Sequence, residues 1–474
     1  MNKLLLTDSY KIGSHWKMYS PDTERVYSYF EARKGGEYPN IVFFGLQYIL
    51  QKFLSGKFVS QHDIDEAEEI CEAHLGNKNT FNRAGWEYIL KEYDGYLPIR
   101  IKAVKEGAVV PISNVLFTVE NTDSKCGWLT NYLESLISHV WYPCTIATAS
   151  FYLKNIINKH LKLSADNSDG LTFMLHGFGY RSYTSNEAAE IGALAHLVNF
   201  KGTDDILAIK SAKEFYDALL HSIAYSVPAS EHSVMSSRGK EGEVDVVENL
   251  LNTFPTGVLS VVGDTYDIYN FVNNFVCGKF KDRILNRDGV FVVRPDSTSP
   301  EHPTKESITL WIVETLYNKL GGYVNSKGFK VINKHCKVLY GDGLSSKDID
   351  LILTTLEEHG FSAENIATFG CGSGLVQKNI NRDTCRFAFK SSWQQRSGIG
   401  YDIFKQPKDE SKTSKRGRFK LVLKNTSIGE TYDTVPEIDP RKDQLRLVFE
   451  NGYLFNRENF SEIRKNAENG MFIK

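Results

Sequence analysis

The sequence lacks any apolar stretch that approaches the roughly 20 residues needed to cross a bilayer as a helix, so we expect no membrane-spanning segment. Its first six residues form only a brief apolar run, and we expect no secretory signal there. The chain also has no large net charge, because it contains 56 Lys and Arg residues and 58 Asp and Glu residues. The electrostatic field of the whole protein therefore does not attract nucleic acid or an anionic membrane. Any positive charge that binds phosphate must come from a local cluster.

Paired cysteines are missing as well. The seven cysteines are scattered, odd in number and without a C-x-x-C motif. This pattern argues against a disulfide framework or a structural zinc site. We expect each cysteine to be a small buried hydrophobe, and we expect the protein to reside in the reducing cytoplasm.

The length and the first part of the chain indicate more than one folded unit. A chain of 474 residues, with 41% hydrophobic and 24% charged residues, is too long for one ordinary core. Residues 26–30, 99–105 and 115–120 have the pattern of strands, and residues 44–54 and 63–75 that of helices. We predict an antiparallel α+β domain over residues 1–148.

From about residue 171 the pattern changes to short apolar runs that end in polar, glycine-containing clusters. These runs cover residues 171–175, 197–200, 258–262, 290–293, 338–340 and 366–369. Helical segments follow several of them, as at 306–320 and 347–359. Polar clusters after nearly every strand favour a (β/α) barrel-like domain of irregular TIM type over a doubly wound sheet, which would concentrate them at one or two switch points.

We assign the barrel-like domain to residues 149–384. The remaining residues, 385–474, contain a basic loop at 408–418 and strand-like runs at 419–423 and 445–449. We expect this C-terminal segment to return to the first domain and complete its α+β structure. The predicted fold class is therefore α/β, with a barrel-like domain packed with an antiparallel α+β domain.

Two clusters carry the chemistry that the residues alone suggest. Residues 370–374 (Gly-Cys-Gly-Ser-Gly) suit a loop whose backbone N–H groups cradle a phosphate, although they can also form a simple turn. Residues 294–297 (Arg-Pro-Asp-Ser) bring a cation and a carboxylate together, as a substrate contact or an internal salt bridge. Because Asp suits sugar hydroxyls and hard cations and Arg suits phosphate, the combination indicates a barrel enzyme that handles phosphates or nucleotides.

Ten motifs in order along the chain resemble those of nicotinamide phosphoribosyltransferases. They are TDSYK at 7–11, YSYFEAR at 27–33, FGLQY at 44–48, FGYR at 178–181, HLVNFKGTD at 196–204, SVPASEHS at 226–233, DTYDIYN at 264–270, RPDS at 294–297, GDG at 341–343 and GLVQK at 374–378. The resemblance implies a type II phosphoribosyltransferase fold that joins nicotinamide to phosphoribosyl pyrophosphate in NAD salvage. It also implies a homodimer with active sites at the subunit interface and ATP as co-substrate. Mg²⁺ would be held by substrate phosphates and water, and its protein ligands are unknown.

The resemblance further implies a role for each matching site residue. Phe178 and the partner subunit's Tyr10 would sandwich the pyridine ring. Asp204 would accept the amide N–H of nicotinamide and repel the carboxylate of nicotinate, while Arg294 would donate to the amide oxygen. The other substrate-binding residues would be Asp8, Asp296, Gly341 and Asp342, the last three at the ribose, and Arg181, Gly372 and Ser373 at the 5′-phosphate. Ser373 stands where the family more often has glycine, and a positive φ there would strain it.

Basic residues and one histidine would handle the phosphoryl groups. The residues expected to bind pyrophosphate or ATP phosphates are Arg33, Arg382, Lys390, Lys405 and Lys412, and a solvated surface cation is the alternative for each. His232 would be phosphorylated by ATP, with Asp264 or Glu231 orienting its ring. Displacement at C1 of the ribose would pass through an oxocarbenium-like state and depend on positioning and electrostatics.

Two other interpretations stay open at this point. The nearest is a nicotinate phosphoribosyltransferase, with the same fold and chemistry but an acid substrate, and Asp204 argues against it. A non-catalytic binding or signalling protein on the same scaffold is the second, since a fold does not determine a function. The joint presence of Asp204, His232, Arg294 and Asp296 argues against a protein that has lost catalysis.

Overall fold

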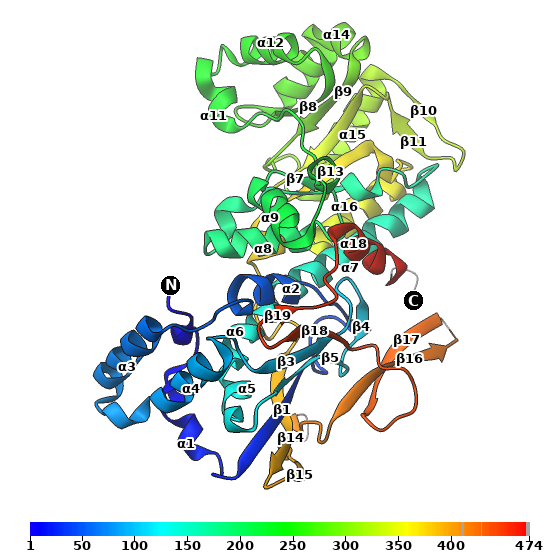
Figure 1. Cartoon of the computed structure of the whole chain (residues 1–474). Helices are drawn as coiled ribbons and strands as arrows, with labels where there is room; N and C mark the ends of the chain where they lie inside the picture. Colours follow the sequence, from blue (N-terminus) through cyan, green and yellow to red (C-terminus); the bar gives the residue numbers. More distant parts are fainter. Residues whose placement is uncertain (409–411, 428, 471–474) are drawn as a thin grey trace. The chain divides into compact units, whose positions relative to one another are not determined.

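Antiparallel and parallel strands form separate sheets in the computed structural model of the chain (Figure 1). The structure describes residues 1–408, 412–427 and 429–470, so residues 409–411 of the predicted basic loop and 471–474 of the predicted C-terminal segment lie outside it. The chain divides into two compact units. The first combines Met1–Thr148, Ser211–Ala218 and Ile380–Lys474, and the second combines Ala149–Lys210 and Leu219–Asn379. The domain boundaries expected from the sequence stay a prediction.

An antiparallel sheet of seven strands forms the centre of the first unit. Its strands lie in the order β15 (Ile399–Asp402), β14 (Phe387–Arg396), β1 (Thr23–Ala32), β5 (Val115–Asn121), β3 (Ile99–Ala103), β18 (Arg446–Glu450) and β19 (Tyr453–Leu454). The rings of Phe117 and Phe387 stack on Phe30 at 4.7 and 5.2 Å between centroids. N-terminal and C-terminal strands thus share one core, which confirms the predicted antiparallel α+β part.

Helices and two small strand pairs complete the first unit. Its main helices are α3 (Gln61–Leu75), α4 (Arg83–Tyr93) and α18 (Phe460–Gly470), and its paired strands are β2 (Asn40–Val42) with β4 (Val109–Pro111) and β16 (Phe419–Thr426) with β17 (Gly429–Pro436). Ser60 and Asp63 form a capping box at the start of α3, and Gly76 ends it in the left-handed conformation. The helix predicted at 44–54 is α2 (Leu46–Ile49) continued by a π-helical stretch over Leu50–Leu54.

A parallel sheet of six strands forms the centre of the second unit. Its order is β7 (Gly202–Thr203), β6 (Leu175–Gly177), β13 (Ile366–Cys371), β12 (Cys336–Tyr340), β9 (Asp288–Arg294) and β8 (Thr256–Val262). Two predicted strands are wrong in detail. Residues 171–175 contain a 3-10 turn over Leu171–Phe173, and 197–200 follow the end of a helix, because a short apolar run alone does not distinguish a strand from a buried turn.

The two edges of this sheet are joined through the segment 225–230. Gly202 of β7 pairs with Tyr225, and Ala229 pairs with Ser260 of β8, both in parallel orientation. The Tyr225 N–H donates to the Lys201 carbonyl at 2.8 Å. A parallel sheet whose edges meet in this way is barrel-like, which confirms the predicted fold class of the second unit.

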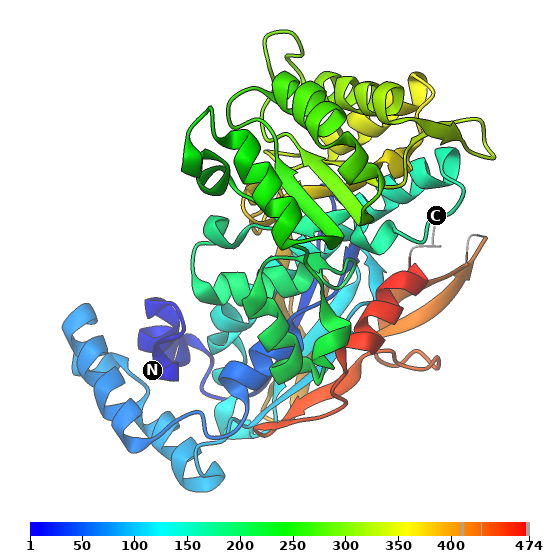
Figure 2. The ribbon, with the colours of Figure 1, turned by 90° about the horizontal axis from the view of Figure 1, so that it is seen from above.

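Helices run along the outside of these strands. They include α8 (Asn186–His196), α12 (Glu243–Thr253), α15 (Lys305–Leu320) and α16 (Ser346–Glu358), while α7 (Trp141–Ser164) and α9 (Ile206–Tyr216) cross from one unit to the other along the chain. In Figure 2 helices coloured green to yellow lie beside the strands of the same colours, and α15 packs on α16 and β12. Across the described ranges of the chain, no helix combines the length and apolarity needed to cross a membrane.

Candidate active site

The loops after the parallel strands surround a cavity of about 420 Å³. Parallel strands deliver the residues that follow them to one edge of a sheet, which is where a barrel enzyme places its chemistry. The cavity is lined by Phe178, Arg181, Ser182, His232, Arg294, Asp296, Gly341, Asp342, Gly343, Gly372 and Ser373. All of these except Ser182 and Gly343 are residues singled out from the sequence.

The Phe178 ring lies directly on the backbone at the ends of β13 and β12. A Cβ atom at Gly370 would stand 1.9 Å from the ring, and one at Gly341 would stand 3.1 Å from its Cζ atom. On another side, the guanidinium carbon of Arg294 lies 5.1 Å from the ring centroid. The two glycines are therefore required for this ring position, which the sequence pattern alone did not reveal.

Arg294 and Asp296 form a two-point ion pair at the end of β9. Nε of Arg294 donates to Oδ1 of Asp296 at 2.7 Å, and Nη2 donates to Oδ2 at 2.8 Å. This is the internal salt bridge that the sequence left open as an alternative, and it lies within the cavity. Burial raises the pKa of Asp296 above its ordinary value, and Asp264 adds to this effect against the opposing charge of Arg294.

Asp264, at the end of β8, holds the loop that carries Asp296. Its Oδ2 atom accepts the N–H of Asp296 at 3.0 Å and the hydroxyl of Ser297. Its Oδ1 atom is buried without a hydrogen-bond partner and lies 3.8 Å from Nε2 of His232. Asp264 therefore contacts the predicted residues His232 and Asp296 as well as Ser297, and its Oδ1 atom accepts no hydrogen bond.

His232 begins the short helix α11 (His232–Met235) and is half exposed. Nε2 of its ring lies 3.7 Å from Oδ2 of Asp296, and Nδ1 lies 3.1 Å from the hydroxyl of Thr265. Asp264, one of the two predicted orienting residues, thus faces the ring, whereas Glu231 accepts the hydroxyl of Ser233. Thr265 was missed, although it stands within the quoted motif at 264–270.

Asp204 follows β7 and is held by two donors. Its Oδ1 atom accepts hydrogen bonds from Nε2 of His176 at 2.8 Å and from the hydroxyl of Ser226 at 2.5 Å. Burial alone would raise the pKa of Asp204, but His176, and then Ser226 and Arg294, lower it below its ordinary value. The carboxylate is therefore ionised at neutral pH. Neither His176 nor Ser226 was singled out from the sequence.

The loop after β13 leads into the short helix α17 (Ser373–Val376). Gly372 precedes the helix with a φ of −107°. The φ angle of Ser373 is not positive, so the backbone strain considered for this residue does not arise. Gly374 is the constrained position instead, because a Cβ atom there would stand 2.4 Å from the Leu344 carbonyl oxygen.

The other predicted site residues lie in the first unit. Tyr10 is half exposed, and its hydroxyl donates to Asp8 at 3.3 Å. Asp8 also accepts the hydroxyl of Ser135. This places the two N-terminal residues side by side, with the Tyr10 ring open to a further contact.

A cavity of about 270 Å³ in the first unit collects most of the predicted basic residues. It is lined by Arg33, Arg382, Lys390 and Lys412, together with Arg386, which the sequence analysis missed. Two nitrogens of Arg33, Nε and Nη2, are buried without a hydrogen-bond partner. Burial lowers the pKa of Lys390, and neighbouring cations add to this effect although Glu134 opposes it. Such an excess of partly desolvated positive charge is suited to an anion with several negative charges.

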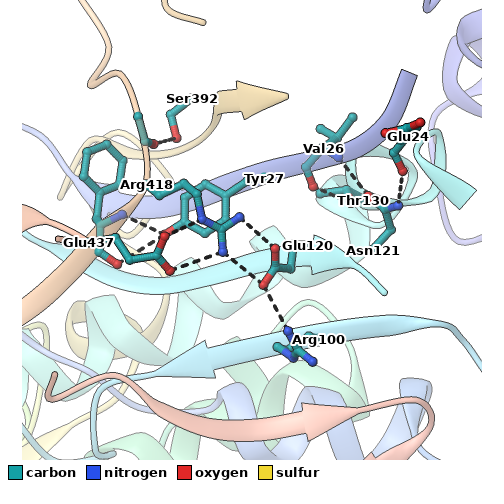
Figure 3. A network of polar contacts seen from close by, with 12 residues as sticks. Glu24, Val26, Tyr27, Arg100, Glu120, Asn121, Thr130, Ser392, Arg418 and Glu437 are labelled. Carbon is teal, nitrogen blue, oxygen red and sulfur yellow. Dashed lines mark hydrogen bonds and ion pairs between the residues drawn. The ribbon is translucent and has the colours of Figure 1, made fainter. Parts of the chain in front are cut away.

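Arg418, at the end of the basic segment, is held by two carboxylates and an aromatic ring (Figure 3). The Arg418 guanidinium donates to Glu120 at 2.9 Å and to Glu437 at 2.6 Å, and it lies 4.6 Å from the Tyr27 ring centroid. Nearby, the Ser392 hydroxyl donates to the Gly417 carbonyl at 2.7 Å, as Figure 3 also shows. Lys405 does not line the cavity, but its N–H donates to the Ser414 hydroxyl at 2.9 Å, which ties it to the same segment.

Residues suited to hold a metal ion are sparse. Within the part of the chain that the structure describes, no group of three or more His, Cys, Asp and Glu side chains has a geometry that could hold one. Asp342 lines the cavity with an exposed side chain, and Oδ1 of Asp264 is buried without a hydrogen-bond partner. With so few carboxylates, Mg²⁺ would take most of its ligands from substrate phosphates and water, and this stays a prediction.

Comparisons with known proteins match nearly the whole chain. A family model described as nicotinamide phosphoribosyltransferase, N-terminal domain, matches residues 2–101, and one described as the nicotinate phosphoribosyltransferase family matches residues 173–453. The chain is 40% identical to a nicotinamide phosphoribosyltransferase of Xanthomonas campestris, with 98% of each chain covered. It is 32% identical to one of Acinetobacter baylyi, with 98% of this chain and 97% of that one covered.

Two solved structures share the fold at low sequence identity. The nicotinate-nucleotide pyrophosphorylase of Pyrococcus furiosus has a TM-score of 0.61 at 14% identity, with 98% of this chain and 95% of that one covered. Human nicotinic acid phosphoribosyltransferase has a TM-score of 0.58 at 14% identity, with 98% and 93% covered. These similarities concern the fold, which agrees with the predicted type II phosphoribosyltransferase architecture.

Proposed function

The chain belongs to the nicotinamide phosphoribosyltransferase family, and from that premise we propose how its residues carry out the reaction. Nicotinamide and phosphoribosyl pyrophosphate are joined to give nicotinamide mononucleotide and pyrophosphate, a step of NAD salvage. The observation that carries this substrate choice is the ionised Asp204 carboxylate. Both hydrogen bonds that it accepts in the described chain go to Oδ1, which leaves Oδ2 for the amide N–H of nicotinamide.

The pyridine ring is proposed to stack on Phe178. A flat ring can lie over the exposed part of this side chain, and stacking contributes about 0.5–1.5 kcal/mol beyond area burial. The half-exposed ring of the partner subunit's Tyr10 would cover the other face in a homodimer with shared sites. Arg294 has one terminal nitrogen, Nη1, outside its pair with Asp296, and we propose that it donates to the amide oxygen.

The ribose and its phosphates would occupy the rest of the cavity. Asp296 and Asp342 offer carboxylates for the ribose hydroxyls, and Gly341 allows the sugar to approach the backbone. Arg181, Gly372 and Ser373 line the same cavity and would bind the 5′-phosphate. As the bond from C1 to pyrophosphate breaks, positive charge develops on the ribose, and the carboxylates of Asp264 and Asp296 stabilise it. The nicotinamide ring nitrogen then forms the new bond at C1.

The basic cavity of the first unit is proposed to bind pyrophosphate or the phosphates of ATP. Its arginines and lysines supply charge that an oligophosphate would neutralise. Mg²⁺ carried by the phosphates would lower their negative charge. We keep the cytoplasm as the proposed location, on the scattered and odd number of cysteines in the sequence.

His232 is proposed to be phosphorylated by ATP. With the Nε2–H directed at the carboxylates of Asp264 and Asp296, Nδ1 carries the lone pair that attacks the γ-phosphorus. The bond between the γ-phosphorus and the leaving ADP oxygen breaks as the phosphorus–nitrogen bond forms. The phosphorylated imidazole would add negative charge to the cavity that His232 and Asp296 line.

The proposed function is tested by incubating the enzyme with phosphoribosyl pyrophosphate and Mg²⁺ while offering nicotinamide and nicotinate in turn. The products are identified by mass spectrometry. Nicotinamide mononucleotide should form with a far larger kcat/KM than nicotinate mononucleotide. A preference for nicotinate would establish the alternative acid substrate, and absence of both products would contradict the transferase activity.

A further inference from the structure

Asp205 is a buried carboxylic acid directly behind the residue proposed to select the substrate. It lies between β7 and α9 and is 2% exposed, whereas its neighbour Asp204 is exposed. Its N–H donates to the Thr203 hydroxyl at 3.0 Å, and its carbonyl accepts the N–H of Ala208 at the start of α9. The position of Asp205 is therefore determined by its own backbone as well as by its side chain.

The Asp205 carboxyl lies under the loop that carries Phe178. The backbone of Gly179, which follows Phe178, acts on this carboxyl and opposes the rise of its pKa. A Cβ atom placed on Gly177 would stand 3.6 Å from Oδ2 of Asp205, which puts the carboxyl beside the end of β6. The other oxygen, Oδ1, is buried without a hydrogen-bond partner.

No cation in the described ranges forms an ion pair with Asp205. The charged and titratable groups around it are Asp204 on its own segment, His176 on β6, His196 at the end of α8, and Arg294, whose charge acts on Asp204. His176 donates to Asp204, and the ring of His196 is held by the Gly202 carbonyl and the Ser150 hydroxyl. A buried carboxyl with an unpartnered oxygen and no ion pair costs stability, and groups of this kind concentrate at functional sites.

We propose that Asp205 is a second specificity-determining residue, whose negative charge adds to that of Asp204 and excludes pyridines that carry a carboxylate. The inference rests on the proposed function, because it assigns a role at the same nicotinamide site. Nicotinamide is neutral and is little affected by a charge behind Asp204, whereas nicotinate is an anion and is repelled by both carboxylates. In a partly desolvated pocket such repulsion is screened less than in bulk water.

The charge state of Asp205 makes this exclusion depend on pH. Burial, and then the neighbouring charge of Asp204, raise the pKa of Asp205 to about 6, although His176 opposes the shift. Asp205 is therefore neutral well below that pH and negative above it. Discrimination in favour of nicotinamide should increase as the pH rises through this range.

Asp205→Asn keeps the shape of the side chain and one acceptor oxygen, but it removes the charge. Asp205→Thr is a second uncharged variant with an acceptor oxygen. Asp166→Asn is the matched control, because it removes a carboxylate that contacts Ser326 on another segment of the second unit. The quantity to measure is the ratio of kcat/KM for nicotinamide over nicotinate, between about pH 5.5 and pH 8, a range that spans the titration.

At the high end of this range, both Asp205 variants should show a ratio about five- to tenfold lower than the parent, through improved use of nicotinate. At the low end they should differ little from the parent, and the rise of the ratio with pH should be reduced in both. Asp166→Asn should follow the parent at every pH. Thermal unfolding at high pH should give a Tm for Asp205→Asn no lower than that of the parent, because a costly buried charge has been removed.

Two results would overturn the proposal. One is an unchanged ratio at every pH in variants that still use nicotinamide. The other is loss of nicotinamide binding in both variants by calorimetry, which would make Asp205 a structural residue. A parent enzyme without activity on nicotinamide would contradict the proposed function itself, so the two failures are distinguishable.

Discussion

The hydroxyl of Tyr269 lies 2.7 Å from Nδ1 of His302, and this contact holds the far side of the loop that carries Asp296. The same hydroxyl lies 2.5 Å from that of Ser299, whose Oγ accepts the His302 N–H at 3.0 Å. The Trp311 ring packs against Tyr269 at 4.5 Å between centroids. Asp264 holds the start of the loop at Asp296 and Ser297, and Tyr269 holds its later part at Ser299 and His302. We therefore infer that Tyr269 is a positioning residue for Asp296.

Tyr269→Phe removes this hydroxyl and keeps the ring on Trp311. We expect kcat/KM for phosphoribosyl pyrophosphate to fall by about tenfold, because a small displacement of a reacting group is costly to catalysis. Stability should fall by only about 1 kcal/mol. Tyr323→Phe, on an exposed residue of the same unit, is the control. His302→Asn should retain much of the activity by offering an acceptor oxygen, and His302→Leu should not; equal losses in the two would contradict a positioning role.

Asp204→Asn tests the main selector. The variant keeps the shape but loses the charge, so a hydrogen bond to the nicotinamide amide worth about 1.5–3 kcal/mol becomes a weaker neutral one. Nicotinate should be used better, because the new amide can donate to its carboxylate. The ratio of kcat/KM for the two substrates separates discrimination from general damage. If both activities persist at an unchanged ratio, Asp204 is not the selector.

His232→Ala is expected to abolish ATP hydrolysis while a slower, ATP-independent transfer remains. The reason is that the imidazole supplies the nucleophile for phosphorylation but lies beside the carboxylates that serve the transfer itself. His221→Ala, at an exposed histidine of α10 (Leu220–Ile223), is the matched control. Phosphate release and nicotinamide mononucleotide are measured together. Hydrolysis at the parent rate, still in step with product, would remove the phosphohistidine from the mechanism.

Mixing two inactive variants tests the proposed homodimer with shared sites. Tyr10→Ala and Asp296→Ala damage different halves of each site if the partner subunit's Tyr10 completes it. Random exchange places half of the subunits in mixed dimers with one intact site each, so activity should recover to roughly a quarter of the parent value. Native mass spectrometry checks that mixed dimers form. Mixed dimers without activity would show that each site is built from one chain.

His160 predicts a pH dependence of stability. Its ring is buried, with Nδ1 at 2.9 Å from Glu357 and Nε2 at 3.0 Å from Asp350. Burial alone would lower the pKa of His160, but the two carboxylates raise it above its ordinary value. The contribution to stability is therefore complete below about pH 6.5, the pKa of an unfolded histidine, and is lost as the pH rises through the higher folded value.

We expect the free energy of unfolding to fall over that rise, measured by urea denaturation at several pH values. In His160→Gln this fall should be absent, because glutamine does not titrate. His62→Gln, an exposed residue of α3, serves as control. A parent and a His160→Gln variant with the same pH profile would contradict the assignment.

Local pattern was enough for most strands and for the motif residues. The apolar runs at 258–262, 290–293, 338–340 and 366–369 all became parallel strands, since each is short, apolar and followed by a polar, glycine-containing cluster. The cavity residues other than Ser182 come from loops after these strands or from the quoted motifs, so the identity of most of them could be predicted. The strand predicted at residues 171–175 was wrong because an apolar run of this length fits a turn as well as a strand.

The sequence by itself determined the family, the class of fold and the residue types that the reaction needs. Only the tertiary structure decided which side chains form hydrogen bonds with these residues: His176 and Ser226 with Asp204, and Thr265 with His232. It also decided that Asp205 is buried. These partners lie 22 to 33 positions away in the chain from the residues they contact. Such contacts exist only after the parallel strands have aligned and the segment 225–230 has joined the two edges of the sheet. Local periodicity does not determine which side chains are close in space. The charge state of each group depends on its neighbours, so it too is set by the assembled fold.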